Sequence, residues 1–314
     1  YRRSAEFIQA LREIWTSDDA QLAGDFYRIR DFNLKPKPLD LPGRQHPEIF
    51  QGGNSTAARG NGGRYADWYF SNGKTFEGVQ EQLTDLKAIA ADFGRPAPPK
   101  FGLNGFIIVR DTEQEAEDQL REIIAKAHVE AVEGFGSAVQ QAGPSTGDKS
   151  GMWADSKFED LVQYNDGFKT NLIGTPDQIA ERIVALKDAG VDLALLAFLH
   201  FQEEVAYFGE HVIPRVRARH PDLLFVAEAY WDLEWALQQQ GFDHCYDKRL
   251  YDRLLHENAD SVRAHLQADL AYQRGLVRFL ENHDEPRAAA TLPPDRHRAA
   301  AVTVATLPGA TLWH

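Results

Sequence analysis

Two groups of residues in this 314-residue chain have the types and spacing to do chemistry. The first is the run Gly52-Gly53-Asn54-Ser55, which lies between an apolar stretch at 47–51 and a helical pattern. Glycines let a backbone approach a ligand closely, and the free N–H groups at the start of a helix favour an anion such as phosphate. An ordinary tight turn from strand to helix has the same composition, so the run by itself leaves both interpretations open.

The second group combines Glu228 with the run Asn282-His283-Asp284. Glu228 follows an apolar stretch and precedes the aromatic residues Tyr230 and Trp231. A carboxyl group at the carboxyl end of a barrel strand, against aromatic rings, is placed to have a raised pKa and to act as a general acid. A His-Asp pair at the end of another strand can hydrogen-bond sugar hydroxyls. Taken singly, each carboxylate fits a solvated loop position better than a catalytic one.

Composition limits the classes of function that these residues can serve. The net charge of -13 argues against nucleic acid, because binding of phosphate backbones needs a basic surface. A single cysteine, Cys245, excludes a disulfide framework and a zinc site made of thiolates, so we expect no structural metal and a reducing cytoplasm. The longest apolar run, 193–199, is too short to span a bilayer, so no membrane partner is expected.

The elements that must position these residues alternate between helix and strand. Apolar spacing predicts a one-sided helix over 2–16, and Thr112 with Glu115 predicts a capping box. Eight strands are predicted, at 47–52, 66–73, 100–110, 191–199, 223–229, 242–247, 276–284 and directly after 300–309. The strand at 191–199 reads as fully buried. This order predicts βαβ units, a parallel sheet and, with four strands from each half, a TIM-type (β/α) barrel.

Two further features concern the extent of the chain. Residues 134–170 are rich in Gly, Ser, Asp and aromatics without a clear period, which predicts a functional loop or lid. The chain starts at Tyr1 in helical pattern and stops at His314 in strand pattern. We therefore expect both ends to be cuts through a larger protein.

Up to about residue 217 the chain resembles the luciferase-like flavin monooxygenases. The stretches that carry the resemblance are FNLKPKPL, HPEIFQGGNSTAAR, YADWYFSNGKTFEG, KFGLNGFIIVRDT, FEDLVQYNDGFKTNLIGTPDQIAERI and HFQEEVAYFGEHVIP. The resemblance implies a barrel that uses reduced FMN, supplied by a partner flavin reductase, and O2 to oxidise a small neutral organosulfur compound such as dimethylsulfone. It leaves open a homo-oligomer, and it implies that most contacts to the flavin ring come from four strands before Tyr1.

The resemblance also assigns roles to individual residues. Tyr1, Gly53, Asn54 and Ser55 match positions that bind the flavin phosphate. Asn104 and Phe106 stand where related alkanesulfonate enzymes have an Arg and a His, which suits an uncharged substrate. His200 matches a His at a strand end, and Lys169 is the expected charged contributor from the lid. The resemblance thus implies that Tyr1 and the run 53–55 bind the cofactor. It implies that Asn104, Phe106, Lys169 and His200 bind the substrate.

The remaining residues, about 220–314, resemble a different family, the alpha-amylase family of glycoside hydrolases. LLFVAEAYWDLE, GFDHCYDKRLYDRL, VRFLENHDEPRAA and TLPGATLWH carry this resemblance. It implies that Glu228 is the acid/base and that His283 and Asp284 stabilise the transition state. The family's nucleophile is an Asp two residues after an Arg, and no Arg-x-Asp occurs in this chain. Glu203 or Glu204 remain as possible substitutes for it.

Taken together, the sequence predicts an α/β chain of two half-barrels, 1–217 and 218–314. Three functional hypotheses follow. The chain is a flavin-dependent monooxygenase, or an alpha-glucoside hydrolase, or a catalytically inactive chimera of two fragments. Both active sites are expected to be incomplete, because each half holds only the later strands of the family that it resembles.

Overall fold

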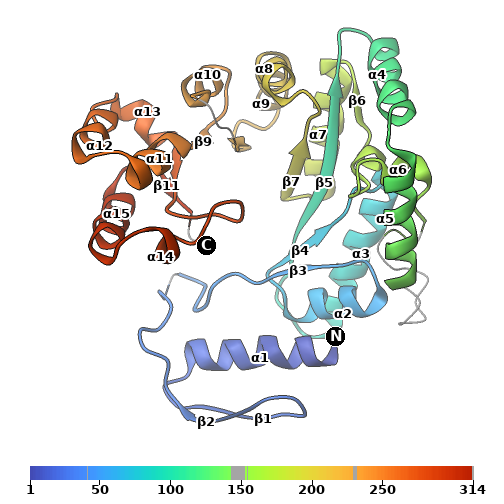
Figure 1. Ribbon diagram of the computed structural model, residues 1–314. Coiled ribbons are helices and arrows are strands. Elements are labelled where there is room, and N and C mark those ends of the chain that lie inside the picture. The colour runs from blue at the N-terminus through green and yellow to red at the C-terminus, as the bar shows by residue number, and fades with distance from the viewer. Residues whose placement is uncertain (41, 143–152, 154, 229–231, 313–314) are drawn as a thin grey trace. The chain divides into compact units, whose positions relative to one another are not determined.

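The computed structural model describes residues 1–40, 42–142, 153, 155–228 and 232–312, without the side chains of 140–142. These residues divide into two compact units, Tyr1–Phe201 and Gln202–His314. Each unit is an α/β structure with a parallel sheet, as predicted (Figure 1). Along the two parallel sheets, every strand except the last one of the chain is followed by at least one helix, which is the order of consecutive βα units.

The first unit begins with helix α1 (Arg2–Thr16), which confirms the helix predicted over these residues. A hairpin follows, formed by β1 (Ala20–Ala23) and β2 (Arg28–Phe32), which pair antiparallel. The Glu6 carboxylate of α1 accepts hydrogen bonds from the backbone N–H groups of three consecutive hairpin residues, 25–27. The Glu6 side chain therefore links the helix to the hairpin.

The parallel sheet of the first unit has five strands. They are β3 (Phe50–Gly52), β4 (Trp68–Ser71), β5 (Lys100–Val109), β6 (Leu172–Gly174) and β7 (Leu193–Ala197). The order is β3-β4-β5-β6, and β7 pairs with the middle of β5, where Phe106 lies opposite Ala197. The predicted count of four was one too low, because β6 has only three residues and shows no periodicity of its own.

Helices connect these strands. They are α2 (Thr56–Tyr65), α3 (Phe76–Asp92), α4 (Glu113–Ala125), α5 (Val129–Ala142), α6 (Phe158–Leu161), the 3-10 helix η2 (Gly167–Thr170) and α7 (Pro176–Ala189). The predicted capping box of Thr112 and Glu115 starts α4. Gly190 ends α7 with φ 110°, a conformation that glycine adopts at no steric penalty. Local sequence signals therefore account for both boundaries.

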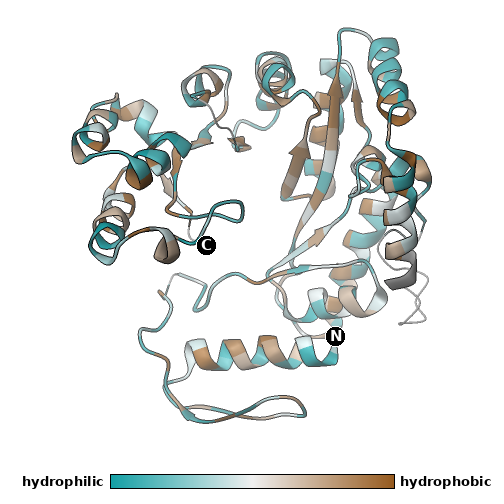
Figure 2. Cartoon of the chain, viewed as in Figure 1, coloured by the Kyte–Doolittle hydropathy of each residue, from teal (hydrophilic) through white to brown (hydrophobic). Residues whose placement is uncertain are grey.

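The prediction that 191–199 is a fully buried strand was wrong. Leu193 and Leu195 of β7 are 40% and 58% exposed, and Figure 2 shows β7 as one of the most hydrophobic strands. The physical reason is its position, since β7 has one neighbouring strand, β5, within the sheet. A run of leucines predicts burial only where elements cover both faces and both edges of the strand.

The prediction that 134–170 is an irregular lid was wrong in part. Residues 134–142 belong to helix α5, and 158–161 and 167–170 are helical as well. Phe135 of α5 packs edge-on against Trp153 and Tyr164, so aromatic residues that looked like loop composition form a packed cluster. The part of the predicted lid at 143–152 and 154 lies outside the described residues.

The second unit contains a four-stranded parallel sheet in the order β11-β10-β9-β8. The strands are β8 (Val226–Ala227), β9 (His244–Tyr246), β10 (Leu276–Arg278) and β11 (Ala310–Thr311). Its helices are α8 (Phe201–His211), α9 (Ile213–Arg217), α10 (Glu234–Gln239), α11 (Lys248–His256), α12 (Ala259–His265), α13 (Leu270–Arg274), α14 (Ala288–Thr291) and α15 (Pro294–Thr306). The four predicted strands are thus present, although each is shorter than expected.

A buried ion pair lies inside the second unit. Arg278, on β10, is fully buried and donates to the carboxylate of Asp247, which is also buried. His265 lies 3.1 Å from the same carboxylate, between its Nε2 and Asp247 Oδ2. Removing one partner of such a pair leaves an uncompensated charge in the interior, so the three residues fix α11, α12 and β10 together. Among the described residues, no helix is long and apolar enough to cross a bilayer.

Candidate functional site

The predicted phosphate loop forms the turn between β3 and α2. Gly53 has φ 128°, and a Cβ atom built on it would lie 2.7 Å from the Cβ of Ala58. Ser55 is the N-cap of α2, and its Oγ accepts a hydrogen bond of 3.2 Å from the N–H of Ala58. Only glycine fits the position of Gly53 without strain, and the start of α2 points its N–H groups towards the turn.

Residues distant in sequence close around this turn. The Tyr1 hydroxyl lies 3.5 Å from the position that a Cβ on Gly53 would occupy, so the two predicted phosphate residues are neighbours. The buried Tyr69 hydroxyl donates to the carbonyl oxygen of Gly53. Gln82 of α3 donates to Asn54 Oδ1 at 3.1 Å. Side chains from β4 and α3 therefore hold the loop, and the Tyr1 hydroxyl lies beside it.

A pocket of about 280 Å³ lies beside the loop, at the carboxyl end of β4. It contains two of the residues that the sequence predicted, Asn54 and Lys169. The other lining residues are Ser71, Asn72, Gly73, Lys74, Thr75, Gly78, Trp153, Asp155, Ser156 and Asp166. In barrels built from βα units, ligands bind at the carboxyl ends of the strands, which is where this pocket is.

Lys169 does not offer a free charge to this pocket. Its Nζ lies 3.0 Å from Ser156 Oγ and 3.5 Å from the carboxylates of both Asp160 and Asp166. Asp166 is 4% exposed, and burial raises the pKa of its carboxyl group, while the hydrogen bond from Ser156 and the charge of Lys169 act in the opposite direction. Lys169 thus neutralises a buried acid of the pocket wall.

Asn104 and Phe106, the predicted substrate residues, both lie on β5 and are buried. Asn104 donates weakly to Gln163 Oε1 and to the carbonyl of Asn165, at 3.5 and 3.4 Å. The Phe106 ring packs edge-on against Phe168, with ring centroids 5.0 Å apart. Neither residue is among those that line the pocket beside Asn54, but the Asn165 carbonyl to which Asn104 donates also accepts from the N–H of Gly73, a residue of the pocket wall.

His200 is exposed and follows the carboxyl end of β7. Lys126 lowers the pKa of the Glu122 carboxyl group, on α4, and His200 is near enough to be one of the smaller causes that lower it. It is not among the residues that line the pocket beside Asn54.

In the second unit, the structure brings the three predicted catalytic residues together. Glu228 follows β8, and His283 and Asp284 follow β10; each offers a ligand atom within 4.8 Å of the others. Tyr246, at the end of β9, belongs to the same place, because the charges of Glu228 and Asp284 add to the burial that raises the pKa of its hydroxyl. All three predicted residues are exposed. The predicted neighbours Tyr230 and Trp231 lie outside the described residues.

The expected substitutes for the missing nucleophile lie on a helix. Glu203 and Glu204 are in the first turn of α8, and Glu204 is 6% exposed. The three clustered residues provide an acid and two hydrogen-bonding groups, which can bind and protonate a sugar oxygen. The second carboxylate of the cluster is Asp284, which the resemblance assigns to transition-state stabilisation, and the Arg-x-Asp that carries the nucleophile is absent from the chain.

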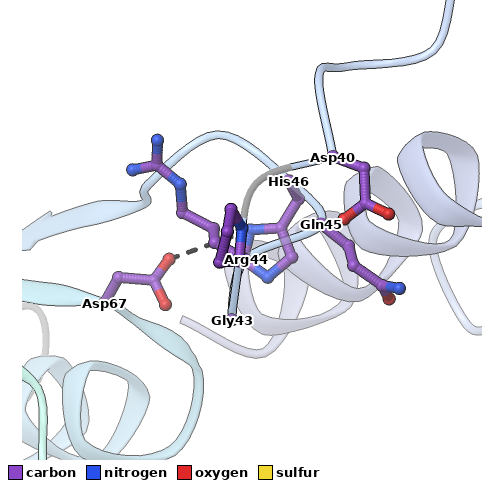
Figure 3. Close-up of a pocket in the computed structure, with 7 residues that line it drawn as sticks. Asp40, Gly43, Arg44, Gln45, His46 and Asp67 are labelled. Atoms are coloured by element: carbon purple, nitrogen blue, oxygen red, sulfur yellow. Dashed lines mark ion pairs between the residues drawn. The ribbon is translucent and has the colours of Figure 1, made fainter.

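A wider pocket of about 560 Å³ lies elsewhere in the first unit, and Figure 3 shows the residues that line it. His46 and Asp67 face each other there, with Nδ1 and Oδ2 4.0 Å apart. Asp67 directly precedes β4, so this pocket is at the amino end of the strand. Residues at that end of a βα sheet generally serve stability, so its size does not make it the candidate site.

Sequence reasoning missed three residues that line the pocket beside Asn54: Ser71, the last residue of β4, and Asn72 and Lys74, in the loop that follows. It predicted 66–73 as a strand and gave none of these residues a role. Their signal was their position, since polar residues directly after a parallel strand lie at its carboxyl end. Tyr69 and Gln82, which hold the Gly53 loop, had no such signal, because their partners are distant in sequence.

Comparisons with known proteins bear on the first unit. The luciferase-like monooxygenase family pattern matches residues 1–193. Over 217 residues, 69% of the chain, it is 62% and 58% identical to FMNH(2)-dependent dimethylsulfone monooxygenases of Pseudomonas putida and Pseudomonas fluorescens. The chain spans 58% of the length of these curated relatives. A riboflavin lyase crystal structure with modified FMN and riboflavin superimposes with a TM-score of 0.52 at 20% identity, covering 68% of this chain and 56% of that one. The similarity shows an α/β fold of the TIM-barrel type.

Proposed function

Because the chain belongs to the luciferase-like monooxygenase family, we propose that its first unit is part of an FMN-dependent monooxygenase that oxidises a small neutral sulfone such as dimethylsulfone. The observation that carries the proposal is the Gly53-Asn54-Ser55 turn. It combines a glycine with positive φ, a helix N-terminus and the Tyr1 hydroxyl at one place. Such a combination suits a phosphate group.

Reduced FMN would supply the electrons with which O2 is activated. The residues that fit its phosphate are Gly53, Asn54 and Ser55, with Tyr1 beside them. A side chain at residue 53 would fill the space in which the phosphate of FMN would approach the backbone. The absence of a side chain at Gly53 is therefore the feature that fits the phosphate. Because Tyr69 and Gln82 already hold the loop, binding requires little reorganisation of it.

Asn104 and Phe106 support an uncharged substrate. Both are buried, and the contacts of Asn104 are with an amide and a backbone carbonyl rather than with an ion. A sulfonate without a cationic partner would be strongly disfavoured in such surroundings, by several kcal/mol. The proposal includes a flavin reductase and O2 as partners, a cytoplasmic location consistent with the single cysteine, and an undetermined state of self-association.

Flavin titration of the purified chain tests the phosphate loop. We expect FMN to bind and Gly53→Val to abolish binding, because a branched side chain would occupy the turn and strain a residue with positive φ. Flavin fluorescence measures both, with Gly60→Ala as the control, since a Cβ on Gly60 meets no atom within 4 Å. Equal FMN affinity in Gly53→Val and the unaltered chain would remove the basis of the proposal. Comparing the turnover of dimethylsulfone with that of an alkanesulfonate, in the presence of added reductase, tests the proposed preference for an uncharged substrate.

A second candidate function rests on the cluster of Glu228, His283 and Asp284. We propose that residues 218–314 derive from an alpha-amylase-like glycoside hydrolase joined to the monooxygenase part, so that the chain is a chimera. The juxtaposition of an acid and a His-Asp pair at the carboxyl ends of β8 and β10 supports this origin.

Hydrolysis of an activated aryl glucoside tests the second candidate. We expect no retaining turnover, because the chain has no Arg-x-Asp, the pattern that carries the nucleophile in the family that this part resembles, and Asp284 is expected to stabilise the transition state instead. Turnover that is lost in Glu228→Gln and kept in Glu257→Gln, an exposed control, would contradict this expectation and make the second unit a working hydrolase.

A further inference from the structure

Two buried hydrogen-bonding groups in the pocket beside Asn54 have no partner among the described residues. They are Ser71 Oγ and Asn72 Nδ2, at the end of β4 and directly after it. Ser71 is 1% exposed, and its buried hydroxyl belongs to the wall of the pocket. A buried polar group without a partner is rare in folded proteins and signals a bound water, ion or ligand.

Lys74, two residues further along the same loop, adds a cation. No ion pair or hydrogen bond within the described chain engages its Nζ, in contrast to Lys169 across the pocket. Burial lowers the pKa of Lys74, and the charges of Arg59 and Lys169 lower it further, while Asp166 and Glu81 raise it. A partly buried ammonium group that lacks a counter-ion favours an anion beside it.

The ends of two helices surround the same pocket. Asn54 directly precedes the N-cap of α2, and Thr75 is the N-cap of the 17-residue helix α3, with Gly78 in its first turn. Both helices therefore direct the positive ends of their dipoles towards the pocket. The polarity of the site is thus set by backbone as well as by side chains.

The loop that carries these groups is rigid. The N–H of Gly73 donates to the carbonyl of Asn165 at 3.0 Å, and a Cβ on Gly73 would lie 2.0 Å from the carbonyl oxygen of Asp166. The acids of the pocket do not cancel its positive character. Asp166 is engaged by Ser156 and Lys169, and Asp155 is exposed to solvent, which screens its charge.

We propose that Ser71, Asn72 and Lys74 form a binding site for a tetrahedral oxyanion of the phosphate class. A hydroxyl, an amide N–H and an ammonium group can each donate to a different oxygen of one such anion. The inference deepens the proposed flavin site, on which it rests only for the flavin phosphate as the source of the anion. A free phosphate is the other source of the same chemistry.

Inorganic phosphate is the probe that tests the site in the complete chain. We expect Lys74→Met to weaken phosphate binding at least tenfold in calorimetric titrations, and Ser71→Ala to weaken it severalfold. Lys87→Met is the matched control, because Lys87 lies on the exposed face of α3, and it should bind as the unaltered chain does. Thermal melting of each variant verifies that the fold is intact. Lys74 should also be protected by phosphate from acetylation, measured by peptide mass spectrometry.

Unchanged binding in Lys74→Met, equal weakening in Lys87→Met, or no saturable binding in the unaltered chain would each overturn the proposal. Competition identifies the source. Displacement of phosphate by FMN but not by riboflavin supports the flavin phosphate, and simultaneous binding of FMN and phosphate supports a free oxyanion. These outcomes are independent of whether the chain turns over a sulfone, so a failure of the proposed function would be distinguishable from a failure of this site.

Discussion

Asp166 shows how a single residue links the candidate pocket to stability. Its carboxylate is buried, accepts hydrogen bonds from Ser156 Oγ at 2.7 and 2.9 Å, and forms an ion pair with Lys169. Burial outweighs these contacts and raises the pKa of the carboxyl group above its ordinary value of 3.8. Asp166 is therefore an ionisable group in surroundings that disfavour its charged form. Ionisable groups with such perturbed pKa values cluster at functional sites.

The pH dependence of stability should report this. A carboxyl group whose pKa is raised on folding contributes most below its unfolded pKa, and that contribution is lost as the pH rises through the folded pKa. We therefore expect Asp166→Asn to gain stability relative to the unaltered chain as the pH rises from about 3.8 towards neutrality. Urea unfolding of both proteins at several pH values measures the difference. A difference that moves the other way would mean that Lys169 and Ser156 outweigh burial.

At the scale of elements, the contact between the loop after β4 and the segment before η2 positions the pocket. Gly73 allows it, because the backbone of 165–166 passes where a side chain at residue 73 would be. The loop in turn places Ser71 and Lys74 opposite Lys169. A glycine required by close approach of two backbones is therefore part of the site, although it offers no functional group.

Gly73→Ala should destabilise the chain by about 1–3 kcal/mol, the usual range for overpacking, because the neighbouring atoms are backbone and cannot rotate away. Gly60→Ala is the control, since a Cβ there lies in open space within α2 and should stabilise by roughly 0.5–1 kcal/mol. Denaturant unfolding measures both changes. A Gly73→Ala protein as stable as the unaltered chain would show that the loop does not depend on this contact.

Elements with local signals could be predicted from the sequence, and those determined by distant contacts could not. The capping residue Thr112 gave the start of α4, and Gly53 and Ser55 gave the turn before α2. The three-residue strand β6 had no periodicity to predict it. The exposure of β7 was not predictable either, because a leucine run carries no information about which neighbours cover it.

The candidate sites follow the same rule. The proximity of Glu228 to Asp284 followed from the parallel sheet, which aligns the carboxyl ends of β8 and β10. The role of Lys169 as the counter-ion of Asp166 did not, because it depends on how the segment 156–169 folds back on itself. The orphaned groups of Ser71 and Asn72 could be found only once the burial of each atom was known.

At the scale of the whole molecule, the chain consists of two compact units that each carry a sheet and a group of candidate residues at the carboxyl ends of its strands. Family membership belongs to the first unit, through residues 1–193. Helices α8 and α9 belong to the second unit, where Phe208 packs against Phe225 and Arg217 pairs with Asp243. Residues 202–217, which resemble the first family in sequence, thus lie in the second unit.

The exposed leucines of β7 have a consequence for the colloidal stability of the chain, that is, for its tendency to aggregate. An apolar strand with an open edge is adhesive towards other copies, whereas a net charge of -13 makes the copies repel one another. The repulsion acts over about 10 Å at 0.1 M salt and over about 3 Å at 1 M salt. Solutions of the chain should therefore remain clear in dilute buffer. They should aggregate in concentrated salt, which screens the electrostatic repulsion between copies and leaves the attraction between their exposed β7 strands.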